Sequence, residues 1–418
     1  MRENVLSLAL WSVVALAATV RAQAATPAPA DAARLARARE LAQKLLLVDT
    51  HIDVPYRLEE NWVDVTRATE GGDFDLERAR AGGLDAAWMS IYVAAEHQKT
   101  GDARAVADRL IDRVEALVGR APDGFALAAT PDAVEAAARA GRVALPMGIE
   151  NGAAIGDDLA NLRHFFARGV RYVTLTHGED NAICDSSYSE KEKRTWQGLS
   201  PFGRQVIAEM NRLGILVDLA HVSDAAFDQA IEIVRAPPIV SHSGCRHFTP
   251  DFERNLDDAR IRALAARGGV IQINFGSGFL TAAANRASLE GWQAAAAFQK
   301  ERALPDGSPE LEAFRKDWLR AHPFPYATVA DVADHIDHVV ALVGIDHVGL
   351  GSDFDGVGDS LPVGLKSVAD YPNLVAELLA RGRSEAEIAK ILGGNLMRVW
   401  RAAERAAAEP GRGGGAAR

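Results

Sequence analysis

The alternation of short apolar runs with segments of helical periodicity is the feature of this sequence that most constrains its fold. Eight apolar runs are each about as long as a strand that is buried on both faces of a parallel sheet. They cover residues 45–51, 84–93, 143–150, 172–177, 215–221, 238–242, 270–275 and 347–353. Between them, apolar residues recur with the period of an amphipathic helix in 103–118, 131–140, 157–167, 202–213, 224–234, 257–266 and 327–343.

Eight strands that alternate with helices in one chain favour an α/β fold of the (β/α)8 TIM-barrel type. An open doubly wound sheet has the same alternation, but no Gly-rich phosphate loop follows any early strand of this chain. The length of 418 residues fits a single barrel with insertions better than two domains. The clearest insertion, 276–326, follows the seventh strand and is expected to lie over the mouth of the barrel.

The first 24 residues are predicted to be a signal peptide. Arg2 precedes an apolar stretch over 4–20, and Ala22-Gln23-Ala24 gives the small-x-small pattern of a cleavage site. The apolar stretch is shorter than the ~20 residues that span a bilayer comfortably, so no stable membrane insertion is expected after cleavage. We expect an exported, periplasmic protein in which 25–44 form a linker and a lead-in helix, 45–405 the barrel domain and 406–418 a flexible tail.

Composition excludes several classes of protein. The net charge is −11 and the chain has no long basic run, which argues against nucleic acid or an anionic membrane surface as a partner. The two cysteines, Cys184 and Cys245, are too few for a disulfide scaffold or a cysteine-rich zinc module. A disulfide between them and two free thiols are equally compatible with the sequence.

Polar residues end six of the eight predicted strands, where the catalytic groups of such barrels lie. These strand ends are Asp49-Thr50-His51-Ile52-Asp53, Gly148-Ile149-Glu150-Asn151-Gly152, Leu175-Thr176-His177, Asp218-Leu219-Ala220-His221, Val240-Ser241-His242-Ser243 and Gly351-Ser352-Asp353-Phe354-Asp355-Gly356. A single strand-end histidine is more often structural than a metal ligand. Four of them at successive barrel positions, together with carboxylates, favour a metal site.

The donor set suits metal-assisted hydrolysis. His51 and Asp53 are two residues apart on a strand, so both side chains point to the same side. His221 and His242 could hold a second ion, with Glu150 bridging the two. Imidazole and carboxylate suit zinc, with manganese or cobalt as substitutes, and a bridged pair would supply a hydroxide nucleophile near neutral pH.

Other polar residues have simpler interpretations. Asp355-Gly356 is typical of a turn. His335 and His338 are three residues apart on a predicted helix, where a solvated face is a better interpretation than chelation.

The motifs taken together resemble the membrane (renal) dipeptidase family of dinuclear zinc peptidases, which have an amidohydrolase-type barrel. The matching stretches run in order along nearly the whole mature chain. They are Val48-Asp-Thr-His-Ile-Asp53, Gly148-Ile-Glu-Asn151, Leu175-Thr-His177, Leu219-Ala-His221, Ser241-His-Ser243, Arg254-Asn255, Gly349-Leu-Gly-Ser-Asp-Phe-Asp-Gly356 and Gly394-Asn395. The stretch after His177 is more similar to bacterial members than to animal ones.

The resemblance implies a role for each residue of the site. His51 and Asp53 would bind the first zinc, His221 and His242 the second, and Glu150 would bridge them. His177 would contact the scissile carbonyl oxygen and stabilise the oxyanion. Asp353 would act as the general acid and base, and Arg254 would bind the substrate carboxylate.

The expected activity is zinc-dependent hydrolysis of dipeptides by a metal-bridging hydroxide, including dipeptides with a C-terminal D-residue. Two alternatives remain at this point. One is a hydrolase of another amide or lactam on the same dinuclear centre, such as an N-acyl amino acid deacylase or a β-lactam-opening enzyme. The other is a binding protein that has lost turnover. Gly276-Ser277-Gly278 departs from the family where some members carry a tyrosine near the substrate, so the sequence leaves the side-chain preference open. A homodimer is compatible with the sequence.

Overall fold

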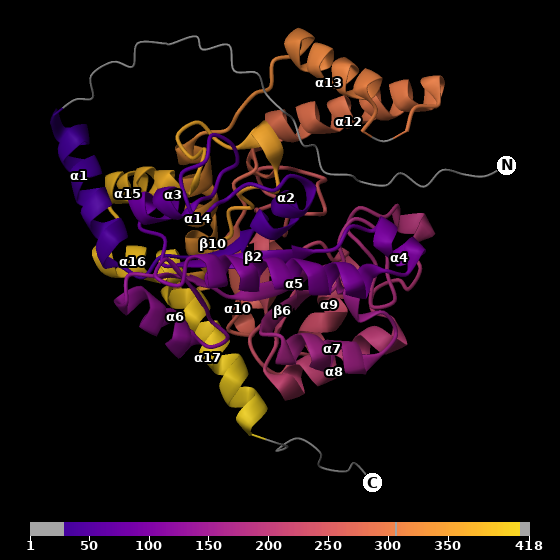
Figure 1. Cartoon of the computed structure of the whole chain (residues 1–418), viewed down its shortest axis with the longest axis horizontal. Helices are drawn as coiled ribbons and strands as arrows, with labels where there is room; N and C mark the ends of the chain where they lie inside the picture. Colours follow the sequence, from indigo (N-terminus) through magenta and orange to yellow (C-terminus); the bar gives the residue numbers. More distant parts are fainter. Residues whose placement is uncertain (1–28, 306, 410–418) are drawn as a thin grey trace.

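The computed structural model describes residues 29–305 and 307–409 (Figure 1). In this part of the chain, ten strands form one sheet in which every pairing is parallel. The strands are β1 (Val48–Ile52), β2 (Ala86–Tyr92), β3 (Phe125–Leu127), β4 (Val143–Leu145), β5 (Met147–Glu150), β6 (Val170–Thr174), β7 (Leu216–Asp218), β8 (Ile239–Ser243), β9 (Val270–Ile273) and β10 (Val348–Leu350).

Eight of these strands make the predicted barrel. Their order is β1, β2, β5, β6, β7, β8, β9, β10. The residues after β10 close the barrel against β1. Asp353 N donates to His51 O over 3.0 Å, and Asp53 N donates to Phe354 O over 2.9 Å. The predicted fold class is therefore confirmed.

The run 143–150, predicted to be one strand, is instead divided into β4 and β5. Pro146 lies between them and has no N–H to continue a ladder. β5 pairs with β2 inside the barrel, whereas β4 pairs with both β2 and β3 and extends the sheet beyond it. β3 was not predicted, because three residues are too few for a periodic signal.

Helices surround the sheet. They are α1 (Pro29–Lys44), α2 (Val54–Glu60), α3 (Leu76–Gly82), α4 (Glu96–Thr100), α5 (Ala103–Arg120), α6 (Pro131–Arg139), α7 (Leu159–Ala167), α8 (Pro201–Leu213), α9 (Asp224–Ile233), α10 (Asp258–Ala266), α11 (Ser277–Leu280), α12 (Ala282–Arg302), α13 (Pro309–Ala321), α14 (Val329–Val343), α15 (Tyr371–Ala380), α16 (Glu385–Ala389) and α17 (Asn395–Ala408). The seven predicted helices correspond to α5 to α10 and α14. Their starts are capped as expected; for example, Ser223 Oγ accepts a hydrogen bond from Ala226 N, and Asp257 Oδ1 accepts one from Arg260 N.

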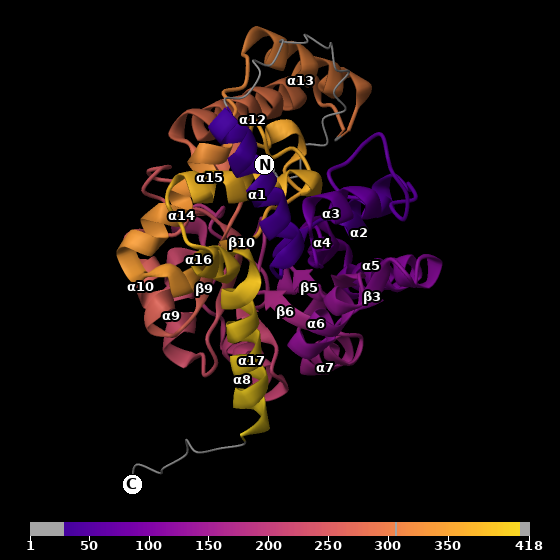
Figure 2. The same ribbon diagram turned by 90° about the vertical axis from the view of Figure 1, so that its left-hand side faces the viewer.

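The C-terminal helix α17 lies across the end of the barrel opposite the insertion (Figure 2). Its buried Trp400 packs against Trp88 of β2, with ring centroids 4.7 Å apart, and Trp88 stacks on Tyr172 of β6. These large rings fill the N-terminal end of the barrel, which leaves the opposite end for polar groups. α17 continues to Ala408, three residues into the segment predicted to be a flexible tail, and ends just before Pro410.

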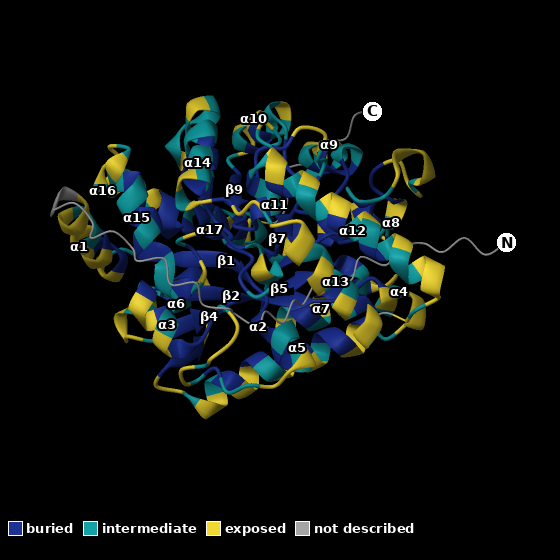
Figure 3. Ribbon diagram, turned by 90° about the horizontal axis from the view of Figure 1, so that it is seen from above, coloured by how far each residue is buried: buried dark blue, intermediate teal, exposed yellow. Residues whose placement is uncertain are grey.

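The insertion after the seventh barrel strand, β9, forms α11 and the helical hairpin of α12 and α13. In the view from above, this hairpin lies over the buried strands (Figure 3). Its helices are held together by Phe298 and Phe314, whose rings stack 4.3 Å apart. The two ends of the insertion meet where Ala327 N donates to Ser277 Oγ over 3.0 Å. The insertion predicted over the barrel mouth is confirmed.

No helix within 29–305 and 307–409 is long and apolar enough to cross a membrane. The predicted signal peptide lies outside the described residues. Cys184 and Cys245 are both buried and both free.

Candidate active site

The eight residues singled out from the sequence lie together at the C-terminal end of the barrel strands. His51 lies on β1, one residue before its end, Glu150 ends β5 and His242 lies on β8. The others occupy the loops that follow β1, β6, β7, β8 and β10: Asp53, His177, His221, Arg254 and Asp353. All eight are buried, since none exposes more than 8% of its surface.

Glu150 is at the centre of this cluster. Its Oε1 lies 3.1 Å from His221 Nε2, 3.3 Å from His242 Nε2 and 3.5 Å from His177 Nε2. Its Oε2 lies 3.2 Å from His51 Nε2 and accepts a hydrogen bond from Ser90 Oγ over 3.0 Å. Burial would raise the pKa of Glu150, but the surrounding imidazoles hold it well below its usual value. The carboxylate is therefore ionised, and its two oxygens face different histidines.

His221 and His242 present uncharged nitrogens to the cluster. Their Nε2 atoms are 2.9 Å apart. Burial, reinforced by nearby positive charge that includes Arg254, holds the pKa of both residues well below the usual value. The ring of His242 is oriented from behind, because its Nδ1 lies 2.8 Å from Ser241 Oγ and that hydroxyl donates to Asp218 Oδ2 over 2.6 Å.

His51 is oriented in the same way from the barrel interior. Its Nδ1 lies 2.9 Å from Tyr172 Oη, and its Nε2 lies 3.4 Å from Asp53 Oδ2. Burial opposes protonation of this ring, but Tyr172, Glu150 and Asp53 together hold the pKa of His51 well above its usual value.

The cluster meets the requirements of a metal centre. Three sets of ligand atoms each lie within 4.8 Å of one another: His51, Glu150 and His242; Glu150, His177 and His221; and His51, Asp53 and Asp353. His51 Nε2 and Asp53 Oδ1 are buried without a hydrogen-bond partner, which is costly unless something else binds them. Imidazole and carboxylate donors, with hydrogen bonds behind the rings, fit a borderline divalent ion. Glu150 belongs to two of the three sets and is the residue that could bridge two ions.

Asp353 faces the cluster from the loop after β10. Its Oδ2 accepts a hydrogen bond from Asn274 Nδ2 over 2.7 Å, which leaves Oδ1 for the site. Its backbone has a positive φ of 65°. Burial, with the nearby charge of Asp53 next in importance, raises the pKa of Asp353 well above its usual value. A carboxyl group in this state can carry a proton and release it.

Arg254 and His177 both contact His221. Arg254 Nη2 is 2.9 Å from His221 Nε2, and its Nε and Nη1 are buried without a partner. Its guanidinium carbon lies 5.3 Å from the centre of the Phe279 ring. His177 packs edge-on against Tyr92, with ring centroids 4.7 Å apart, and burial lowers its pKa.

Several supporting residues were not predicted. Ser90 and Asn274 lie on β2 and directly after β9, the two strands for which no polar end residue was assigned, so the strand-end rule could have indicated them. Tyr172 gave no signal, because a tyrosine inside an apolar run has the pattern of core packing. Gly356 was predicted only as part of a turn, but it also packs directly against the site. A Cβ at this position would lie 2.3 Å from both Asp353 Oδ1 and Asp53 Oδ2.

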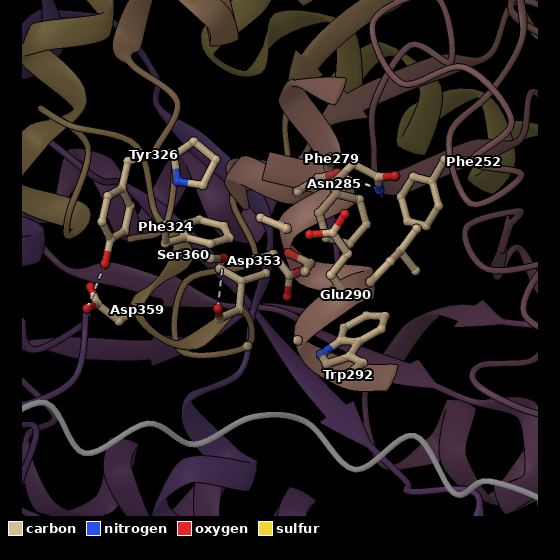
Figure 4. A pocket seen from close by; sticks show the side chains of 18 of the residues that line it. Phe252, Phe279, Asn285, Glu290, Trp292, Phe324, Tyr326, Asp353, Asp359 and Ser360 are labelled. Carbon is tan, nitrogen blue, oxygen red and sulfur yellow. Dashed lines mark hydrogen bonds between the residues drawn. The ribbon is translucent and has the colours of Figure 1, made fainter. Parts of the chain in front are cut away.

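A cavity of about 390 Å³ opens on the cluster, and the insertion forms its outer wall (Figure 4). Asp53, Glu150, His177, His221, His242 and Asp353 line its floor. Most of the remaining lining is apolar, and seven Phe, Tyr and Trp side chains contribute to it: Tyr188, Phe252, Phe279, Trp292, Trp318, Phe324 and Tyr326.

Comparison with known proteins gives a consistent result. Residues 35–411 match the model of the membrane dipeptidase family, peptidase family M19. An uncharacterized dipeptidase of Schizosaccharomyces pombe is 31% identical over 388 residues, which cover 88% of this chain and 83% of that protein.

Two solved structures have the same fold. The probable dipeptidase PvdM from Pseudomonas aeruginosa matches with a TM-score of 0.77 and 29% identity, over 90% of this chain and 99% of that one. A metallopeptidase from Rhodobacter sphaeroides, liganded with a phosphinate mimic of the dipeptide L-Ala-D-Ala, matches with a TM-score of 0.70 and 24% identity, over 86% and 99% of the two chains. The match to the family model over most of the chain, together with the curated relative, confirms the resemblance found in the sequence: this chain belongs to the membrane dipeptidase family, peptidase family M19.

Proposed function

We propose that this member of the M19 metallopeptidases is a zinc dipeptidase with two ions bridged by Glu150. The observation that carries the proposal is the arrangement around Glu150, whose two oxygens face four histidine Nε2 atoms at 3.1–3.5 Å. In this assignment His51 and Asp53 would hold one ion, and His221 and His242 would hold the other. Bound zinc would supply a water of lowered pKa as the nucleophile and would polarise the scissile carbonyl.

Three residues of the chain are assigned to proton transfer, oxyanion stabilisation and binding of the substrate carboxylate. Asp353 Oδ1 takes the proton of the attacking water and delivers it to the leaving amine, while Asn274 holds Oδ2. His177 Nε2 donates to the developing oxyanion. Arg254 binds the substrate carboxylate through its two unpartnered nitrogens, Nε and Nη1.

The proposed substrates are dipeptides, including those with a C-terminal D-residue. The Rhodobacter sphaeroides metallopeptidase of the same fold is liganded with a mimic of L-Ala-D-Ala. This supports the proposal that a site of this fold accepts a D-residue at the C-terminal position of the dipeptide. A buried arginine at one end of the site and a metal for the free amine at the other would together limit the substrate to two residues. We also propose that the enzyme is exported, on the basis of the signal-peptide pattern in residues 1–24.

A substrate comparison on zinc-loaded protein tests the proposal. L-Ala-L-Ala and L-Ala-D-Ala should be hydrolysed, whereas N-acetyl-Ala-Ala and Ala-Ala-amide should be poor substrates. Faster cleavage of the N-acetylated compound would favour a deacylase instead. Activity that persists in full after the metal has been chelated would contradict the proposed chemistry.

A further inference from the structure

The cavity has two aromatic regions, one on each side of Asp353 (Figure 4). Phe252 and Phe279 lie on one side. Phe324 and Tyr326 lie on the other, together with Asp359 and Ser360 of the loop after β10. A dipeptide held over the metal cluster would extend from one region to the other.

The first region belongs to the carboxylate end of the site. Phe279 lies 5.3 Å from the guanidinium carbon of Arg254, and its carbonyl accepts a hydrogen bond from Asn255 Nδ2 over 2.7 Å. Phe279 is thus tied to the residue that follows Arg254. The C-terminal residue of a substrate whose carboxylate meets Arg254 therefore lies beside Phe279.

The second region belongs to the amine end. Gly356 touches Asp53 and Asp353 so closely that it leaves no room for a side chain there, and Val357 next to it lines the cavity. Tyr326 Oη donates to Asp359 Oδ2 over 3.0 Å, and Lys366 Nζ lies 4.1 Å from the centre of the Tyr326 ring. These contacts fix the end of the insertion, with Phe324, against the loop that carries Asp353.

We infer that the cavity selects dipeptides whose N-terminal residue has a large apolar, preferably aromatic, side chain. This inference rests on the proposed dipeptidase function. With the backbone of the N-terminal residue beside Asp53 and Gly356, its side chain points towards Phe324 and Tyr326. A small side chain would leave this apolar wall in contact with water, whereas an aromatic ring would displace that water and pack against the rings.

The carboxylate of the second region defines the competing result. Asp359 lines the cavity and accepts the hydrogen bond from Tyr326 Oη, whereas Glu290 lies on the side of Asp353 that carries Phe279 (Figure 4). A long cationic side chain on the N-terminal residue could place its stem on the aromatic rings and its charge near Asp359. The apolar composition of the rest of the wall favours the uncharged ring.

The test compares four substrates with zinc-loaded enzyme: Phe-Ala, Ala-Ala, Ala-Phe and Lys-Ala. We expect kcat/KM for Phe-Ala to exceed that for Ala-Ala by about tenfold or more, with Ala-Phe and Lys-Ala below Phe-Ala. Phe324→Ala should lower the ratio of kcat/KM for Phe-Ala to kcat/KM for Ala-Ala to near one, and Phe324→Leu should give an intermediate ratio. Trp62→Ala removes an aromatic side chain that is 45% exposed and outside the cavity, so it should keep the preference.

Binding to the Asp353→Asn variant, measured by calorimetry, separates the preference from the chemistry. The variant should bind Phe-Ala about tenfold more tightly than Ala-Ala. Equal turnover and equal binding of Phe-Ala and Ala-Ala would overturn the preference and leave the dipeptidase function standing, as would a better result for Lys-Ala or Ala-Phe. Failure to bind or cleave any of the four would overturn both.

Discussion

The Nε2 atoms of His221 and His242 lie 2.9 Å apart, and burial holds the pKa of both imidazoles well below the usual value. Two uncharged nitrogens that point at one another need a shared proton or a shared cation between their lone pairs. The ring of His242 has a hydrogen-bond partner behind it, so rotation away from this arrangement would cost a buried contact. The pair is thus held in a geometry that favours metal binding.

Metal removal should therefore lower stability as well as activity. Zinc added to chelator-treated protein should raise the melting temperature, since a ligand at a thousand times its Kd stabilises the folded state by about 4 kcal/mol. Glu150→Gln should lose most of this zinc-dependent increase, because the carboxylate faces both halves of the site. Glu192→Gln, a charge change on the exposed surface, should retain it. An unchanged melting temperature for wild-type protein with and without zinc would count against a structural metal centre here.

Asp353→Asn should separate proton transfer from metal binding. Asparagine tolerates the positive φ of this position and can still accept the hydrogen bond from Asn274. We expect the zinc content to stay the same while kcat falls by about 10²-fold or more. Asp251→Asn is the matched control, because Asp251 has a φ of 69° and is exposed. Near-normal turnover by the Asp353 variant would remove this residue from the mechanism.

Much of the barrel and its metal cluster could be predicted from the sequence because the signals are local. Each buried strand is an apolar run, and a polar residue at the end of such a run stands out, as His242 does after Ile239 and Val240. β3 is too short to give a periodic signal. The division of 143–150 into two strands could have been predicted, because Pro146 has no N–H to continue the ladder.

The supporting contacts depend on tertiary structure and could not be predicted in this way. Tyr172 contacts His51 across 121 positions of sequence. His335, expected on a solvated helix face, is fully buried because the insertion and the loop after β8 cover α14 there. Neither fact is contained in the periodicity of a single helix or strand.

Gly356→Ala should damage the site without unfolding the protein. The added methyl carbon would lie 2.3 Å from Asp353 Oδ1 and from Asp53 Oδ2, so at least one carboxylate must move. We expect kcat/KM to fall by about 10²-fold, since small displacements of catalytic groups have effects of this size, and the zinc affinity should also fall. Gly119→Ala in α5, where a Cβ meets nothing within 4 Å, should behave as wild type in both measurements. Full activity of the Gly356 variant would show that the two carboxylates need not be held so closely.

His335 should make stability depend on pH below neutrality. Its Nδ1 accepts a hydrogen bond from Cys245 N over 2.9 Å, and its Nε2 lies 3.0 Å from Leu280 O, so the neutral ring joins the loop after β8 to the insertion. Burial lowers the pKa of His335 to about 4 from an ordinary value of 6.5, so the unfolded chain binds a proton more readily than the folded one between these values. The stabilisation is complete above about pH 6.5 and is lost as the pH falls towards 4, by roughly 3 kcal/mol in total. His335→Gln cannot titrate, and its side-chain amide can keep the hydrogen bond to Leu280 O. In urea unfolding of metal-free protein, the variant should therefore lose less free energy of unfolding between pH 7 and pH 5 than wild type. Parallel losses in the two proteins would mean that His335 does not contribute to the acid sensitivity.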